Sequence, residues 1–470
     1  MDPYCPIKVP ILNNYAATLN QVEIAQNNNK YYILQVLDDG NQYHLYTRYG
    51  RVGDKGRTGI KTYKDKNVAI SEFCKTFKTK TGNTWDTPFV KKPGKYMLLE
   101  LEAPTLKVVN SSSAAAAANS DTSKEEMVEG GKLDPRVSRI IQMIGNKKMM
   151  NQTLIHLDID TARLPLGKIS KNQIKQANEI LKYISDNIDT LSPSEFIAKS
   201  SEFWTIVPFG SGRRPPPVLN ELIQITQCSR LLETLENIEI AGTILQQNNT
   251  DLDVYNSLGL TLTPMESDDE FELIKRYISI THGKTHKYSL EIVSAFKVNK
   301  DADNTVFNSI PNHCLLFHGS RMANFIGILS EGLRIPRNDQ VLNGSTLGNG
   351  IYFADSVTKS YNYTYSSETD NLGFILICEV ALGNPEFVTG CNPYPLDSNY
   401  HSRIAQGNNT PDPSGFYSID EVVVPCGSLV PNPNASHSTF LYNEYVVYNK
   451  NQYRFKYLVL CGMNSFPYHS

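Results

Sequence analysis

Three consecutive residues, His318, Gly319 and Ser320, stand between a short apolar run and a helical pattern. The run at 314–317 is typical of a buried strand, and the apolar residues of 325–333 recur at three- and four-residue steps, as on one face of a helix. An imidazole, a backbone amide without a side chain and a hydroxyl therefore meet at a strand-to-helix turn. A lone histidine at such a turn is usually structural, so a functional interpretation depends on its neighbours.

A second group of candidates surrounds the strand pattern GNGIYFAD. Ser360 and Tyr363 follow it in a helix-like segment and are three residues apart, so they face the same side. Together with Tyr352 they supply two aromatic faces and a hydroxyl. These residue types predict a slot lined by two aromatic rings.

Glu444 is the third candidate, in the middle of the strand pattern FLYNEYVVY. It is the only charged residue between Thr439 and Tyr448. A carboxylate in an apolar strand costs free energy unless it is paired or has a function. We therefore expect Glu444 to act in a site.

Three other patterns are near matches to known motifs and are rejected. Gly283 begins GKTH, but Ile278 stands where a phosphate loop needs glycine. His282 and His286 have the spacing of a helical metal pair, yet no glutamate or third ligand accompanies them. The glycines of 344–350 precede a strand instead of joining a strand to a helix. The sequence predicts no phosphate loop, metal site or dinucleotide-binding glycine motif.

The candidates belong to a C-terminal segment, residues 262–470, in which apolar runs such as FILICEVALG and FKYLVLC alternate with polar loops and short helical patterns. This texture predicts a mixed α+β domain. Residues 132–250 show longer helical periodicities, one of them behind the candidate N-cap Ser170, and predict an all-α bundle.

Residues 25–105 contain aromatic and β-branched runs, Gly-rich turns and one helical pattern, which predict a small β-rich module with one helix. Residues 1–24 are assigned to an N-terminal tail, and the Ser/Ala/Asn-rich stretch 106–131 to a flexible linker. From Lys30 to Lys95 basic residues outnumber acidic ones. This imbalance fits either a solvated lysine-rich face or a surface that binds a phosphate backbone.

The chain of 470 residues is 40% hydrophobic and 20% charged, with a net charge of −3. No apolar run approaches the roughly 20 residues of a membrane span. The N-terminus resembles no secretory signal, and the eight cysteines lack metal-binding spacing. We expect an intracellular protein of about three domains, with reduced thiols and no membrane partner.

Four segments, LLFHGSRMANFIGILSEGLRI, GNGIYFADSVTKSYNY, TPDPSG and FLYNEYVVY, resemble the catalytic domain of the DNA-dependent poly(ADP-ribose) polymerases. The family's His-Tyr-Glu signature falls on His318, Tyr352 and Glu444. LPLGKISKNQI resembles the family's helical regulatory domain, and YTRYGRVGDKGR with KTGNTW resembles its Trp-Gly-Arg (WGR) module. The resemblance covers everything except the tail and the linker. It implies a WGR module, a helical regulatory domain and an ADP-ribosyltransferase domain, in that order.

The resemblance implies that NAD is the substrate and that no metal is used. Gly319 would bind the carboxamide of nicotinamide through its backbone, and Ser360 would add a hydroxyl. Tyr352 and Tyr363 would stack on the two faces of the ring. The glycine suits this role because it lacks a Cβ that would keep the amide away.

His318 would hold the adenosine-side ribose. Glu444 would stabilise the oxocarbenium-like transition state that forms as nicotinamide leaves, and would polarise the acceptor hydroxyl during elongation. The other implied NAD contacts are Ser320, Gly327 and Arg334.

The intact signature favours transfer of ADP-ribose to proteins, including histones and the enzyme itself, followed by chain elongation. A mono-ADP-ribosyltransferase and a non-catalytic scaffold that binds DNA ends remain as alternatives. An accessory histone PARylation factor is a further possible partner.

The family's break-sensing role would fall on the WGR module, where Tyr49 would stack on a nucleotide while Arg51 and Arg57 meet phosphates at a DNA strand break. Tyr49 replaces the module's namesake tryptophan. Two further departures are Phe317, where tryptophan is common, and Ser345, where an aromatic is frequent. The domain order implies that DNA binding relieves autoinhibition by the helical domain, and it implies a nuclear protein of the DNA damage response.

Overall fold

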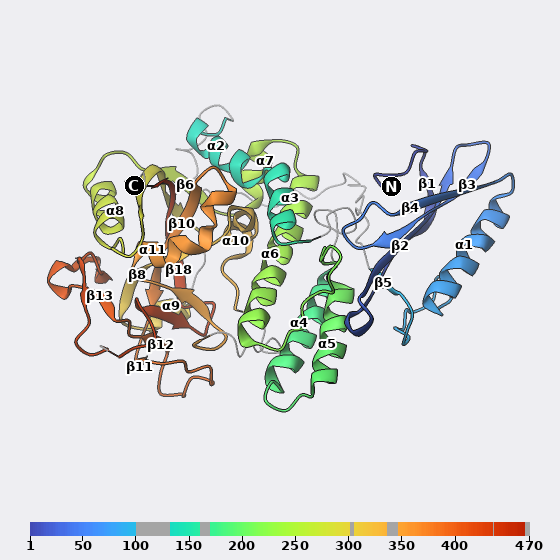
Figure 1. Cartoon of the computed structure of the whole chain (residues 1–470). Helices are drawn as coiled ribbons and strands as arrows, with labels where there is room; N and C mark the ends of the chain where they lie inside the picture. The colour runs from blue at the N-terminus through green and yellow to red at the C-terminus, as the bar shows by residue number, and fades with distance from the viewer. Residues whose placement is uncertain (100–131, 160–169, 301–304, 336–345, 436, 466–470) are drawn as a thin grey trace, which may run out of the picture. The chain divides into compact units, whose positions relative to one another are not determined.

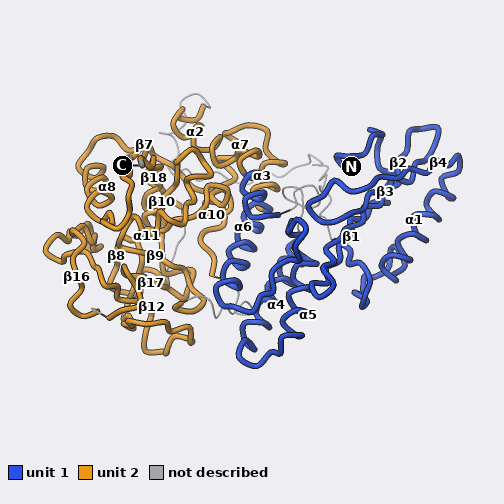
Figure 2. The backbone as a smooth tube through the Cα atoms, in the orientation of Figure 1, with its two compact units in different colours: residues 1–105, 150–239 blue, residues 106–149, 240–470 orange. Residues whose placement is uncertain are grey.

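The structure, a computed structural model, describes residues 1–99, 132–159, 170–300, 305–335, 346–435 and 437–465. The predicted linker at 106–131 and the departure at Ser345 lie outside the described residues. The chain folds into two compact units, which comprise residues 1–105 with 150–239 and residues 106–149 with 240–470 (Figure 2).

The first unit contains an antiparallel sheet with the strand order β4-β3-β2-β1-β5. Its strands are β1 (Ile11–Glu23), β2 (Asn28–Asp38), β3 (Tyr43–Arg51), β4 (Arg57–Tyr63) and β5 (Met97–Leu99). Helix α1 (Lys66–Thr81) packs along one face of this sheet (Figure 1), where Phe73 and Phe77 are buried against Leu34. The side chain of Asp65 caps the helix by accepting a hydrogen bond from the backbone N–H of Asn67. The small sheet with one helix agrees with the predicted WGR module.

The N-terminal segment differs from the tail assigned to residues 1–24. Most of it forms β1, an interior strand between β2 and β5. Before the strand, Asp2 is buried against Arg48, with 2.7 Å between Oδ2 and Nη2. The assignment failed because a strand covered on both sides has no simple alternation of polar and apolar residues, and β1 carries four Asn or Gln residues within NNY and LNQ.

Helices complete the first unit: α4 (Lys171–Asp186) and α5 (Pro193–Ile206) belong to it, while α3 (Lys147–His156) and α6 (Leu222–Gln247) each continue across the unit boundary in the sequence. Ser170 caps α4 as expected, because its hydroxyl accepts from the N–H of Gln173. Helix α5 packs on β1, where the N–H of Val22 donates to Thr205 Oγ1 at 3.0 Å. The WGR sheet and the helix α5 of the predicted bundle are therefore joined by specific hydrogen bonds.

The second unit is built on two sheets. The larger has the order β14-β15-β8-β10-β18-β7-β6 and the smaller the order β11-β12-β17-β9. The strands are β6 (Thr261–Pro264), β7 (Tyr288–Asn299), β8 (His313–Gly319), β9 (Ile351–Phe353), β10 (Leu372–Ala381), β11 (Pro385–Val388), β12 (Ser402–Ala405), β14 (Tyr417–Ile419), β15 (Val422–Val424), β17 (Glu444–Val447) and β18 (Tyr453–Ser465); β13 (Asn409–Pro411) and β16 (Leu429–Pro431) form a separate pair. The helices are α2 (Pro135–Ile144), α7 (Asp251–Ser257), α8 (Asp269–Ile280), α9 (Thr305–Ser309), α10 (Phe325–Glu331) and α11 (Val357–Tyr361). The mixed α+β prediction is confirmed.

The core of this unit lies between the larger sheet and helices α8 and α11. Phe317 of β8 is fully buried there and stacks on Tyr277 of α8, with 4.2 Å between ring centroids. The phenylalanine thus keeps an aromatic packing role at the position where the family commonly has tryptophan. Of the helices described here, none is long and apolar enough to cross a membrane.

Candidate active site

Three strands bring the His-Tyr-Glu residues together. β8 ends with His318 and Gly319, and the residue before them, Phe317, exchanges two backbone hydrogen bonds of 2.8 and 3.0 Å with Ala354, just after β9. β9 in turn pairs with β17, which begins at Glu444. The signature residues, far apart in the sequence, therefore lie on three adjacent strands.

His318 is oriented by the strand beside it. Its Nδ1 lies 2.9 Å from the carbonyl oxygen of Tyr352, and because a carbonyl only accepts, this nitrogen carries the proton. Burial lowers the pKa of His318 and outweighs the opposing effect of that hydrogen bond. The ring is therefore neutral near pH 7, which leaves Nε2 as an acceptor suited to a sugar hydroxyl.

Tyr352 is fixed at its phenol end. The hydroxyl donates to the carbonyl of Gly348 at 2.7 Å and accepts from the N–H of Leu347 at 3.1 Å. These two bonds hold the far edge of the ring while β9 holds its near edge. The flat face of the ring is thus presented in one orientation.

Gly319 and Ser360 are in direct contact. A Cβ at residue 319 would lie 1.9 Å from the carbonyl oxygen of Ser360, a separation that no side chain can occupy. The Ser360 hydroxyl is buried and donates to the carbonyl of Phe317 at 3.0 Å. Glycine is therefore required here by the approach of α11 to β8, in addition to any approach of a ligand.

Glu444 is buried, with 8% of its surface exposed, and is paired. Its Oε1 forms an ion pair with Nζ of Lys359, and Thr346 Oγ1 lies 3.5 Å from its Oε2. Sequence reasoning missed Lys359. The available signal was its place beside Ser360 in the helical segment SVTKSY.

Asp355 is a second residue that sequence reasoning missed. Its Oδ2 accepts hydrogen bonds from Asn443 Nδ2 at 2.7 Å and from the Tyr445 hydroxyl at 2.9 Å. These partners flank Glu444, so Asp355 fixes the strand on both sides of the Glu444 carboxylate. Complete burial raises the pKa of Asp355 to about 6.

The remaining predicted NAD contacts lie on neighbouring elements. Ser320 is buried and accepts from Asn324 Nδ2 at 2.9 Å. Gly327 is buried within α10, and Arg334, just after that helix, lies 3.2 Å from Glu331. Tyr363 is half-buried in a 3-10 turn (Asn362–Thr364) that directly continues α11. The roles of these four residues as NAD contacts stay predictions.

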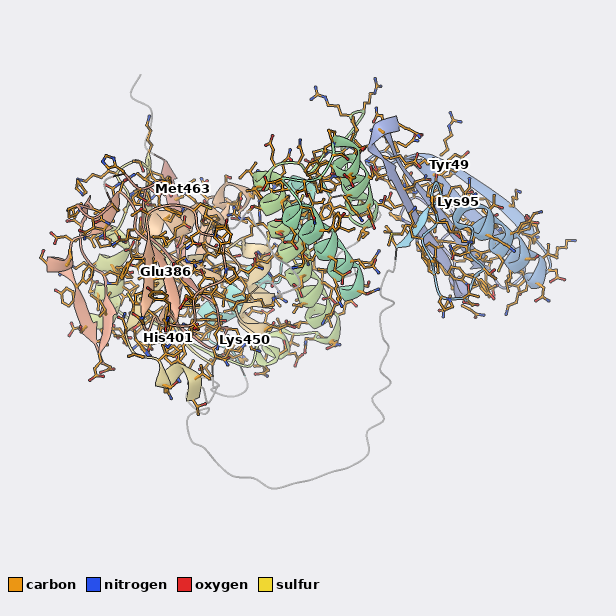
Figure 3. The ribbon with its side chains drawn as sticks, turned by 90° about the horizontal axis from the view of Figure 1, so that it is seen from below. Tyr49, Lys95, Glu386, His401, Lys450 and Met463 are labelled. Carbon is orange, nitrogen blue, oxygen red and sulfur yellow. The ribbon has the colours of Figure 1, made fainter. Side chains whose placement is uncertain are left out.

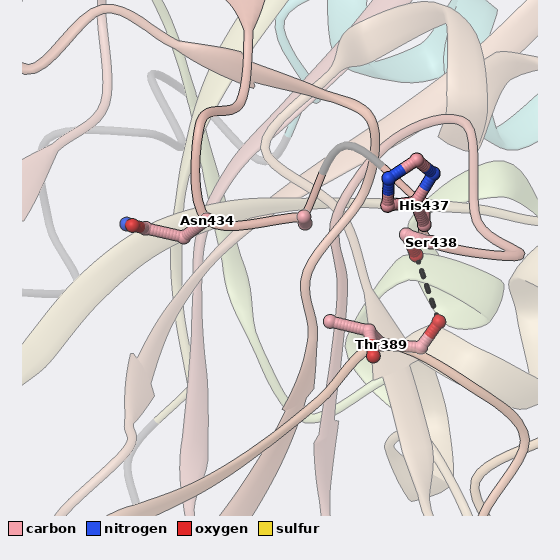
Figure 4. A pocket seen from close by; sticks show the side chains of 5 residues that line it. Thr389, Asn434, His437 and Ser438 are labelled. Atoms are coloured by element: carbon pink, nitrogen blue, oxygen red, sulfur yellow. Dashed lines mark hydrogen bonds between the residues drawn. The ribbon is translucent and has the colours of Figure 1, made fainter.

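A small pocket lies elsewhere in this unit (Figure 4). It measures about 140 Å³, and Ser438 Oγ beside it donates to the carbonyl of Thr389 at 3.0 Å. Its lining residues are Thr389, Asn434, Ala435, His437 and Ser438. None of the predicted NAD contacts lines it. Among the described residues, no group of three or more His, Cys, Asp or Glu side chains is placed to hold a metal ion.

The predicted DNA-binding residues lie on β3 and β4 of the WGR sheet. Tyr49 is 43% exposed (labelled in Figure 3) and stacks on Tyr32, with 5.5 Å between ring centroids and 9° between planes. Arg57, directly opposite Tyr49 on β4, is exposed, and Lys80 of α1 lies 4.6 Å above the Tyr32 ring. An exposed aromatic with cations around it is suited to a nucleotide and its phosphates.

Arg51 is placed differently. Its guanidinium donates to the carbonyls of Gly212 and Arg214 in the loop after α5, and to the carbonyl of Asn27 at 2.9 Å. Arg51 thus ties the WGR sheet to the 212–214 loop inside the first unit. Its side chain has fewer donors left for a phosphate than Arg57 has.

Comparison with known proteins agrees with this layout. The chain matches family models for the WGR domain over residues 15–91, for the poly(ADP-ribose) polymerase regulatory domain over 131–259, and for the poly(ADP-ribose) polymerase catalytic domain over 268–463. The match to the WGR domain begins at residue 15 and so includes most of β1, which also belongs to the WGR sheet of the structure.

Relatives match nearly the whole chain. It is 37% identical to poly(ADP-ribose) polymerase 2 of Arabidopsis thaliana and 34% identical to poly(ADP-ribose) polymerase 2 of Homo sapiens, with 96% and 99% of this chain aligned to 73% and 83% of those proteins. It is 35% identical to poly(ADP-ribose) polymerase 1 of Danio rerio, but spans only 45% of that longer protein.

The two-sheet catalytic unit, with its histidine, tyrosine and glutamate on adjacent strands, defines an ADP-ribosyltransferase that uses NAD as its substrate. Together with the WGR and regulatory domains, these findings establish that the chain belongs to the poly(ADP-ribose) polymerase family.

Proposed function

We propose that this protein is a poly(ADP-ribose) polymerase whose activity is stimulated by DNA strand breaks and that modifies proteins, including histones and itself. The observation that carries the proposal is the placement of His318, Tyr352 and Glu444 on adjacent strands, with Gly319 closed against Ser360. The reaction and the DNA response are separable, and each has its own test.

The nicotinamide end of NAD would bind against Gly319. Its carboxamide bonds the backbone N–H and C=O of that residue and the hydroxyl of Ser360, while its ring stacks between Tyr352 and Tyr363. The neutral His318 accepts a hydrogen bond from the adenosine-side ribose through Nε2. These contacts hold the bond to be broken in a fixed place, which removes much of the entropic barrier.

The chemical step breaks the bond between C1′ of the ribose and the pyridinium nitrogen. The bonding electron pair goes to that nitrogen, so nicotinamide leaves neutral, and positive charge develops on the ribose. The carboxylate of Glu444 stabilises this charge, and an acceptor oxygen attacks C1′ and loses its proton. Lys359 holds the carboxylate in place in the free enzyme through their ion pair.

Glu444→Gln tests the reaction. It removes one charge without changing shape, and we expect the rate of nicotinamide release to fall about 100-fold or more. Glu272→Gln, on the exposed face of α8, is the matched control and should keep full activity. Equal rates in both variants would reject the assignment of Glu444.

Product length separates polymerase from mono-ADP-ribosyltransferase. Automodification with labelled NAD should give a ladder of long chains on a denaturing gel. A single discrete shift would support the mono-transferase, and no label at all would support the scaffold.

The DNA response would start at a face of the WGR module formed by Tyr49, Arg57 and Lys80, where the exposed Tyr49 rests on the buried Tyr32. The stacked tyrosines offer a flat surface for an unpaired or terminal base, and the two cations neutralise phosphates beside it. Tyr49→Ala with Arg57→Ala should lower the stimulation by a 5′-phosphorylated nicked duplex and leave the DNA-independent rate unchanged. Tyr183→Ala, an exposed tyrosine on α4, is the control. If nicked DNA does not raise the rate of the unmodified protein, the proposed switch is wrong.

The nuclear location and the accessory factor belong to the same proposal. A DNA-break sensor acts where DNA is, so a fluorescent fusion should be nuclear. Histone labelling should rise when a histone PARylation factor is added, if the acceptor site is completed by a partner. Unchanged histone labelling would assign the whole acceptor site to this chain.

A further inference from the structure

Arg403, in β12, is a buried cation outside the predicted site. Its side chain is 1% exposed, and Nε donates to Glu386 Oε2 at 2.7 Å. Nη1 lies within 3.1 Å of four further acceptors, which are the carbonyl oxygens of Leu347, Asn392 and Tyr394 and the hydroxyl of Tyr448. A surface ion pair needs none of these additional partners. A buried guanidinium with several acceptors holds the segments that supply them in fixed positions.

The backbone of Leu347 connects this cation to the active site. Its carbonyl accepts from Arg403 at 3.1 Å and from the Tyr448 hydroxyl at 2.5 Å. Its N–H donates to the hydroxyl of Tyr352 at 3.1 Å, and that hydroxyl donates onward to the carbonyl of Gly348. The backbone of Leu347, hydrogen-bonded at its carbonyl and at its N–H, therefore links the guanidinium to the ring that is proposed to stack on nicotinamide.

The same short segment is held from a second direction and also meets Glu444. Asn392 donates its N–H to the carbonyl of Thr346 at 2.8 Å, and Thr346 Oγ1 lies 3.5 Å from the Glu444 carboxylate. Gly348 has a φ of +82°, and a Cβ there would lie 3.0 Å from the carbonyl of Pro393. The loop around 392–394 and the segment 346–348 are thus fitted closely together, and Arg403 donates to both.

We propose that Arg403 is a positioning residue for NAD, which acts through Leu347 to hold the phenol of Tyr352 in the orientation that stacks on the nicotinamide ring. The proposal rests on the proposed function, because it takes NAD as the substrate. It assigns to Arg403 an effect on ring binding and only a small effect on the chemical step.

Arg403→Met is the primary test. It removes the donors and keeps most of the volume, and we expect the KM for NAD to rise about 10-fold while kcat changes by less than about threefold. The dissociation constant of nicotinamide alone, measured by calorimetry, should rise by a similar factor. Arg403→Lys should give constants between those of the wild type and of Arg403→Met, because an ammonium can pair with Glu386 but lacks the planar set of donors of a guanidinium. Arg276→Met, on the exposed face of α8, should leave both constants unchanged.

A double-mutant cycle tests the route through Tyr352. Tyr352→Phe removes the hydroxyl, so in that background Arg403→Met should raise the dissociation constant of nicotinamide by much less than 10-fold. Two independent, multiplying effects would overturn the proposal. So would a lower melting temperature of Arg403→Met with both constants unchanged, since that result describes a purely structural residue.

Two variants keep the test decisive if Arg403→Met does not fold. Tyr448→Phe removes the second donor to Leu347, and Glu386→Gln removes the charge partner of Arg403; each should weaken nicotinamide binding in the same direction by a smaller factor. Unchanged binding in both would overturn the proposal. Failure of the proposed function is distinguishable, because it would appear in the unmodified protein as no nicotinamide binding and no release from NAD.

Discussion

The active site and the WGR face use their side chains in opposite ways. In the catalytic unit Glu444, His318 and Tyr352 are each engaged by a protein partner. On the WGR face Tyr49 and Arg57 project from the sheet, and Tyr49 rests on another ring without being enclosed. A site that breaks one bond needs its groups fixed to within fractions of an ångström. A surface that binds a charged polymer acts through charge and stacking, which tolerate motion of the side chains.

Arg51 belongs to the WGR module but, like the residues of the active site, is engaged by protein partners. It belongs to the WGR motif by sequence, but its donors serve the 212–214 loop and Asn27. The motif therefore contains an exposed aromatic and, two residues later, a cation whose donors are used within the first unit. Resemblance alone assigned both to DNA.

Gly319→Ala should give the largest effect and tests how rigid the catalytic site is. The added Cβ would meet the carbonyl of Ser360, so β8 or α11 must move and the carboxamide contacts are lost. We expect kcat/KM for NAD to fall about 100-fold or more. Gly390→Ala, where no atom lies within 4 Å of the added Cβ, should be neutral. A mild effect at Gly319 would mean that the site adapts as readily as the WGR face.

Asp355→Asn tests the electrostatic consequence of burial. The pKa of Asp355 is raised to about 6 from an ordinary value near 4, so the folded protein binds this proton more tightly than the unfolded chain. Wild-type stability from this group is therefore present below about pH 4 and is lost as pH rises to about 6.

The expected measurement is the melting temperature of both proteins between pH 4 and pH 7. The melting temperature of the variant minus that of the wild type should increase over this range and then level off. The total increase should correspond to about 3 kcal/mol in the free energy of unfolding. Glu291→Gln, at an exposed position of β7, should show no such trend. A difference that is constant with pH would contradict the burial argument.

Lys359→Met should have an intermediate effect. Without its cation partner the buried Glu444 carboxylate loses its fixed orientation, and we expect kcat to fall about 10-fold. Lys359→Arg should recover most of the activity, and Lys275→Met on the surface of α8 should have no effect. Full activity in Lys359→Met would mean that Glu444 is oriented by its strand alone.

Tyr49→Trp should have the smallest effect, and it tests the WGR face instead of the active site. A larger ring stacks more strongly on a base, so the Kd for a nicked duplex should fall roughly threefold with no change in the DNA-independent rate. Fluorescence anisotropy at two salt concentrations measures this, with Tyr183→Trp as the control. Weaker binding by the tryptophan variant would show that the platform is shaped for tyrosine.

Much of the candidate site was predictable because its signals are local. The end of β8 at His318 and, in the first unit, the Ser170 cap depend on residues within a few positions of each other. The resemblance to the family then linked His318, Tyr352 and Glu444. Local patterns and motifs can be interpreted without knowledge of the fold, because the backbone geometry that relates near neighbours in a helix or strand is nearly constant.

The sequence by itself therefore determined the order of the three domains and the identity of the signature residues. Only the tertiary structure decided that β1 is an interior strand, that Lys359 pairs with Glu444, that Asp355 holds the flanks of that residue, and that Arg403 donates to the segment behind Tyr352. Each of these depends on the register between strands or loops distant in the chain. A shift of one residue in any of those pairings would turn the side chain to the opposite face, and no local pattern specifies it.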